Sequence, residues 1–142
     1  MKDKWEAINA ILDIASQKVK DIDSSISLKI YVHQLSNLII AKIIDTKVTN
    51  TYLQNFERGI QNEDASLYRT LENLIKRCKL TEKGYELKNL IKCDLFNEVI
   101  KSIEKHEIEC TIDMAIDFTK AALKQDVINA ALKHAEIKDA NT

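Results

Sequence analysis

The chain has 142 residues, of which 45% are apolar and 30% are charged, and its formal net charge is -1. It contains no proline and only 2 glycines, so it lacks the turn residues that an all-β fold needs. The balance of apolar and charged residues is that of a folded chain and excludes a disordered one. We therefore expect an all-α protein with one domain over residues 1–142, ending in a short flexible tail at about 139–142.

No segment approaches the ~20 uninterrupted apolar residues of a membrane span. The start, MKDKWEAINAILDIASQK, has charges where a signal peptide is continuously apolar. The cysteines Cys78, Cys93 and Cys110 are odd in number and lie within helical patterns, which suits a reducing compartment. We expect a cytoplasmic protein. The abundance of Ile, Lys and Asn is typical of AT-rich coding and suggests a small microbial or viral protein.

Apolar residues recur along most of the chain at steps of three and four, the spacing of amphipathic helices. Short polar side chains that cap helices precede several of these runs, at 23–25, Thr49, Thr81 and Asp94. We expect one compact bundle of five to seven helices with long first and last helices. The expected helices cover about 3–22 and 25–45, a short stretch after Thr49 or Asn50, 67–78, segments after Thr81 and Asp94, and about 111–138.

Two pieces of the middle region, SLYRTLENLIKR (66–77) and LTEKGYEL (80–87), are of special interest. The first resembles the recognition helix of winged-helix repressors of the PadR type, and the second resembles the segment that leaves the wing in both the PadR and MarR types. The resemblance implies a DNA-binding transcriptional regulator. In those families a two-stranded wing separates the two pieces, whereas here only two residues do. The implied base contacts are Tyr68, Arg69 and Asn73, and the implied phosphate contacts are Lys76, Arg77 and Lys79.

The charge and the spacing of this region favour a simpler interpretation. Residues 64–92 carry 7 basic and 4 acidic side chains, a smaller excess than DNA-binding domains usually show. The polar link from Arg58 to Ser66 is also longer than the turn of a helix-turn-helix, which has about three or four residues. We therefore rank an amphipathic helix with a solvated basic face ahead of DNA binding, and keep DNA binding as the alternative.

Cys93, His106 and Cys110 are weak candidate metal ligands, because His106 and Cys110 are one helical turn apart and zinc prefers thiolate and imidazole. The paired C-x2-C motif of strong zinc sites is absent. We therefore predict no metal and no cofactor. The sequence also has no Gly-x-Ser-x-Gly turn and no glycine-rich phosphate loop, so an enzyme is disfavoured.

The last third of the chain is acidic: residues 93–142 carry 10 acidic and 6 basic side chains. Several carboxylates are one helical turn apart, a spacing that magnesium sites use, but no second acidic helix accompanies them. A solvated acidic face is the preferred interpretation. Such a face would attract a basic partner surface by electrostatic steering. Its members are Glu104, Glu107, Glu109, Asp113 and Asp117.

These observations favour a non-enzymatic, regulatory protein-binding module of the inhibitor, immunity or adaptor type. We expect it to use the acidic face on a protein partner and to be a homodimer. The homodimer is predicted from the apolar seam of the first helix and from the segment LIIAKII (38–44), which is apolar on nearly all sides. The alternative is a DNA-binding regulator that uses the 66–90 helix pair.

Overall fold

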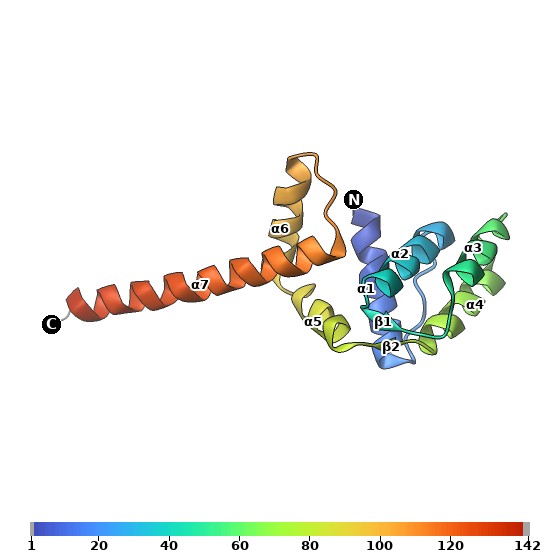
Figure 1. The fold of residues 1–142 in the computed structure, drawn as a ribbon, viewed down its shortest axis with the longest axis horizontal. Coiled ribbons are helices and arrows are strands. Elements are labelled where there is room, and N and C mark those ends of the chain that lie inside the picture. The colour runs from blue at the N-terminus through green and yellow to red at the C-terminus, as the bar shows by residue number, and fades with distance from the viewer. Residues whose placement is uncertain (1, 141–142) are drawn as a thin grey trace. The chain divides into compact units, whose positions relative to one another are not determined.

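The computed structural model describes residues 2–140 and is mostly helical (Figure 1). This confirms the expected all-α class, with a small two-stranded sheet as an addition. Contacts between Cα atoms group the chain into two units, 1–88 and 89–142, so the single domain stays a prediction. The elements in chain order are α1 (Lys2–Gln17), α2 (Leu28–Ile40), β1 (Ile44–Asp45), α3 (Asn50–Arg58), α4 (Ala65–Lys76), β2 (Lys79–Leu80), α5 (Glu82–Leu90), α6 (Asp94–Lys105) and α7 (Ile112–Ala140).

The first and last helices differ in how well they match their predicted lengths. With 29 residues α7 is the longest described helix, whereas α1 has 16 residues and ends well before residue 22. The reason is Lys18, whose φ of 67° is left-handed and ends the helix. Its N–H donates to the carbonyl of Ile14 at 2.7 Å. Of the flexible tail predicted at about 139–142, residues 139–140 belong to α7. Residues 141–142 lie outside the described residues.

The core of the first unit is built by α1, which packs against α2 and α4. The apolar seam of α1, including Ile8 and Leu12, is buried. Within LIIAKII, Ile40 is exposed while Leu38 and Ile43 are fully buried. Much of the apolar seam of α1 and three of the seven residues of LIIAKII are therefore buried inside the chain, and the homodimer stays a prediction.

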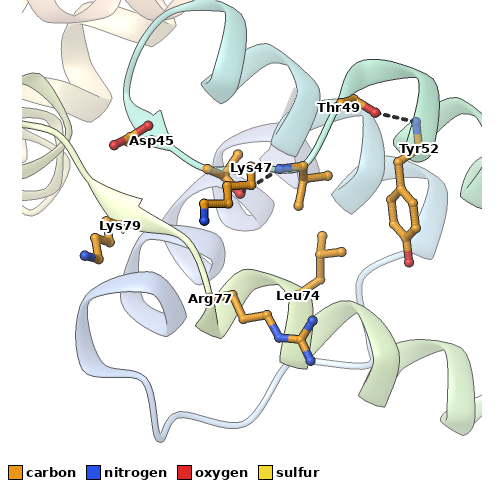
Figure 2. A pocket seen from close by; sticks show the side chains of 9 residues that line it. Asp45, Lys47, Thr49, Tyr52, Leu74, Arg77 and Lys79 are labelled. Carbon is orange, nitrogen blue, oxygen red and sulfur yellow. Dashed lines mark hydrogen bonds between the residues drawn. The ribbon is translucent and has the colours of Figure 1, made fainter.

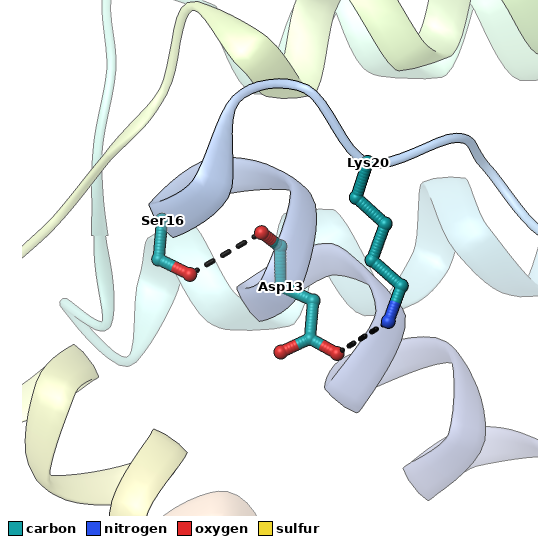
Figure 3. Close-up of polar contacts among 3 residues, drawn as sticks. All are labelled: Asp13, Ser16 and Lys20. Atoms are coloured by element: carbon teal, nitrogen blue, oxygen red, sulfur yellow. Dashed lines mark hydrogen bonds and ion pairs between the residues drawn. The ribbon is translucent and has the colours of Figure 1, made fainter.

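Polar contacts hold the segment after α1 in place (Figure 3). The Nζ of Lys20 lies 3.0 Å from a carboxylate oxygen of the buried Asp13. Farther along, the N–H of Ile22 donates to the carboxylate of Glu72 on α4 at 2.6 Å. The segment is thus fixed at one end to α1 and at the other to α4.

The helix starts follow the capping chemistry, although not always at the predicted residue. Thr49 is confirmed as the cap of α3, since its hydroxyl accepts a hydrogen bond from the N–H of Tyr52 at 3.1 Å. Helix α2 starts later than expected because Ser27, not 23–25, caps it. Helix α6 starts at Asp94, one residue after the Cys93 cap position, so the cap expected at Asp94 is wrong by one residue.

The two short strands pair antiparallel. The residues LTEKG (80–84), which begin the motif LTEKGYEL, connect α5 to these strands by hydrogen bonds and close packing. Ile44 lies opposite Leu80 in the pair. The N–H of Thr81 donates to the carbonyl of Ile43 at 3.0 Å, and the Thr81 hydroxyl accepts from the N–H of Gly84 at 3.1 Å. A Cβ on Gly84 would collide with the Ile43 carbonyl oxygen. This motif therefore joins β1 to α5 in addition to capping a helix.

In the second unit α6 packs against α7. The buried side chains include Phe96 and Ile100 of α6 and Ile112 and Ile116 of α7. At 1.5 Å per residue α6 is about 18 Å long and α7 about 43 Å, so α6 covers only part of α7. None of the described helices is both long and apolar enough to cross a membrane.

Candidate nucleic-acid interface

Helix α4 has one buried face and one polar face. Asp64 caps the helix by accepting a hydrogen bond from the N–H of Ser66 at 2.9 Å. The buried face contains Tyr68, Leu71 and Ile75, and the helix packs against α1. Residues on the other side of the helix are therefore free of packing and face solvent.

The exposed face of α4 carries no carboxylate. Its members follow the i, i+3, i+4, i+7 spacing of one helical face: Ser66, Arg69, Thr70, Asn73 and Arg77. Glu72 is the only acidic residue of α4, and it lies away from this face. There its carboxylate accepts the Ile22 N–H and lies 3.4 Å from the Nζ of Lys76. The face thus combines positive charge with neutral hydrogen-bonding groups.

Tyr68 does not belong to this face, so its predicted contact with base edges is corrected. The side chain is 5% exposed, and its hydroxyl lies 2.6 Å from the Ile26 carbonyl oxygen and 2.7 Å from the Glu63 carboxylate. Burial, and then the hydrogen bond to Glu63, raise the pKa of Tyr68. The same hydrogen bond, with a second from the Leu28 N–H, lowers the pKa of Glu63. Tyr68 therefore joins α4 to the segment before α2.

A pocket of about 660 Å³ lies beside the end of this face (Figure 2). Its cationic lining residues are Lys47, from the segment between β1 and α3, Arg77, the C-cap of α4, and Lys79, on β2. Asp45 is the one acidic lining residue, and it pairs across the strands with Lys79. The pocket is therefore positive and open to an anion.

The first turn of α3 borders the same pocket. Thr49 and Tyr52 line it, and Leu74 gives it an apolar patch. The N-terminal end of a helix carries a partial positive charge, so this end of α3 adds to the field of the cations. Arg77 belongs to both the pocket and the exposed face of α4, so the two form one continuous surface.

The structure brings together four of the six predicted nucleic-acid contacts. Arg69, Asn73 and Arg77 share the exposed face of α4, and Lys79 joins them through the pocket. Lys76 is half-buried and paired with Glu72, so it lies at the edge of this cationic surface. Sequence reasoning missed Lys47, since only the pairing of β1 with β2 brings it beside Arg77. The missed Ser66 and Thr70 could have been found from helical spacing.

The five residues of the predicted acidic face all belong to the second unit. Glu104 is half-buried near the end of α6, while Asp113 and Asp117 are exposed and one turn apart on α7. Glu107 and Glu109 lie in the segment between these helices, where Glu107 has a left-handed φ of 59°. These carboxylates therefore occupy three consecutive segments, with only Asp113 and Asp117 sharing one helical face.

The candidate metal ligands Cys93, His106 and Cys110 all belong to the second unit. Cys110 is buried and Cys93 half-buried, and their thiols point to the carbonyls of Thr111 and Asn89 at 3.7 and 3.6 Å. His106 is exposed at the end of α6. Among the described residues, no group of three His, Cys, Asp or Glu side chains could hold a metal ion.

No protein-family model, curated protein or solved structure matches this chain in the comparisons.

Proposed function

We propose that this protein binds duplex DNA through the exposed face of α4 and the cationic pocket beside it. The observation that carries the proposal is a helix face with Arg69, Asn73 and Arg77 and without any carboxylate. Sequence alone ranked DNA binding second because the whole region has a small basic excess. DNA binding is supported by the position of Glu72, the only carboxylate within α4, which contacts the Ile22 N–H and Lys76 away from the exposed face, while Asp64 caps the N-terminal end of the helix.

The residue types on this surface match the chemistry of duplex DNA. Arginine binds guanine, and asparagine binds adenine, with two hydrogen bonds each in the major groove, which is wide enough to admit a helix. Arg69 and Asn73 are therefore assigned to base edges. Lys47, Arg77 and Lys79 are assigned to backbone phosphates, which fix position without reading sequence.

The experiment is a titration of short duplex DNA at about 50 mM salt with a variant that loses two charges from the face. The double substitution Arg69→Ala and Arg77→Ala should weaken binding at least tenfold. The matched control, Lys101→Ala with Lys133→Ala, removes the same charge from exposed positions on α6 and α7 and should leave affinity nearly unchanged. Equal weakening by both variants would show that net charge, rather than this surface, determines binding.

The second candidate function is the protein-binding module that the sequence ranks first. It is supported by the exposure of Glu107, Glu109, Asp113 and Asp117 in the acidic part of the chain. The test is capture of a basic partner in low salt by the wild type and by a variant with Glu107, Asp113 and Asp117 changed to their amides. Unchanged capture would contradict the role of the acidic face.

A further inference from the structure

Helix α7 exposes large apolar side chains along much of its length. Phe118 is 52% exposed, Ile128 42% and Leu132 59%, and all side chains of residues 124–136 are exposed. Helical segments of this length are marginal in water without packing, and most helical stability in proteins comes from burying an apolar face. This part of α7 therefore has an exposed apolar surface, and a partner that covers this surface would stabilise the helix.

The exposed residues form a regular seam. Five small or apolar side chains and one glutamine recur at alternating steps of three and four, the spacing by which two helices pack along their length. At about 100° per residue, the seam lies opposite the side of α7 that carries the buried Ile112, Ile116 and Thr119. We call it the α7 seam, and its members are Phe118, Ala121, Gln125, Ile128, Leu132 and Ala135.

We infer that two copies of this chain pair antiparallel through the α7 seam. When the seam is reversed on a second copy, Phe118 faces Ala135, Ala121 faces Leu132, and Gln125 faces Ile128, all in one register. The outer layers then each combine a large side chain with a small one, which fills space evenly. A parallel pair would instead place two Phe118 rings in one layer and two Ala121 methyls in the next, leaving crowded and empty layers.

The charges beside the seam and the surface area that pairing would bury are both consistent with an antiparallel pair. In the antiparallel register Lys124, beside the seam, faces Ala131, so the lysines of the two copies do not meet. Gln125 is the one polar member, and its side-chain amide N–H donates to the Asn129 amide oxygen at 3.0 Å within the same helix, so it needs no polar partner across the seam. The seam is about 27 Å long, and two helices buried along it hide on the order of 1,000 Å², the lower limit for a specific interface.

The molar mass in solution tests the inference, which does not depend on DNA binding. Sedimentation equilibrium should give twice the 16.3 kDa chain mass for the wild type and 16.3 kDa for Ile128→Asp. The matched control is Val127→Asp, because Val127 is 69% exposed on another side of the same helix. It should remain a dimer. A monomeric wild type at high concentration, or equal dissociation of both variants, would overturn the inference.

The orientation is tested by the distance between two spin labels. A label at Glu136→Cys, in a chain with Cys93→Ser, reports only on α7 because Cys78 and Cys110 are buried. Residue 136 of one copy then lies near residue 117 of the other, so the labels should be about 28 Å apart. A separation near 10 Å, as in a parallel pair, would overturn the antiparallel arrangement.

Discussion

Gly84 offers a sharp test of how the first unit is assembled. It lies in the first turn of α5, where a Cβ would collide with the Ile43 carbonyl oxygen and lie 3.2 Å from the Leu80 Cβ. Both neighbours belong to the strand region, and a backbone carbonyl cannot move aside as the end of a side chain can. We therefore expect Gly84→Ala to push α5 away from β1.

The size of the effect follows from two opposing contributions. Alanine in a helix is favoured over glycine by about 1 kcal/mol. Overpacking a tight contact costs about 1–3 kcal/mol, and displacing the backbone adds to this. The net expectation is a loss of about 1–2 kcal/mol in the free energy of unfolding, measured by urea denaturation followed by circular dichroism.

Gly59 provides the matched control for this substitution. Its φ is -78°, and an added Cβ would lie 3.4 Å from the Phe56 carbonyl oxygen, which is close to an ordinary contact. Gly59→Ala should therefore leave stability within about 0.5 kcal/mol of the wild type. If Gly84→Ala were as stable as Gly59→Ala, the close approach of α5 to β1 would be refuted.

The remaining predictions concern the polar contacts around α4 and α5. Tyr68→Phe should lower the free energy of unfolding by about 1–2 kcal/mol, because it removes the one hydroxyl proton that the Ile26 carbonyl oxygen and the Glu63 carboxylate share; no loss would contradict this role. Glu63 has a lowered pKa, so its contribution is present above its ordinary value of 4.5 and is lost as pH falls through the lowered value. Stability measured against pH should therefore show the deficit of Glu63→Gln shrinking below about pH 4.5, and a constant deficit would contradict the linkage. Thr81→Val should cost about 1 kcal/mol, as the N–H of Gly84 loses its cap, and a thermal melt matching the wild type would argue against that bond.

Much of the fold could be predicted from sequence because helical periodicity and capping are local. Leu71 and Ile75 lie one helical turn apart, and both are buried on α4 as their spacing requires. A cap at Thr49 or Asn50 is predictable because a capping side chain serves an N–H only a few residues away, and Thr49 accepts from the N–H of Tyr52. The same spacing would have placed Tyr68 on the buried face, had it not been assigned to DNA by resemblance.

The strand pair and the pocket could not be predicted in this way. Each strand has two residues, too few to show alternation of apolar and polar side chains. The pocket depends on Lys47 and Arg77 meeting through that pairing, although they are far apart in the sequence. The end of α1 also escaped prediction, because the left-handed φ of Lys18 has no local sequence signal such as glycine.

The most direct test of the central claim is the affinity for duplex DNA measured over a salt series. If duplex DNA contacts Lys47, Arg69, Arg77 and Lys79 as assigned, the wild type should bind duplex DNA at about 50 mM salt. The logarithm of its binding constant should fall with the logarithm of salt concentration at a slope of about -3, as expected when roughly three phosphates are neutralised. The variant Arg69→Ala with Arg77→Ala should bind more weakly and show a shallower slope. A protein that binds no duplex even at the lowest salt would contradict the account and direct attention to a protein partner.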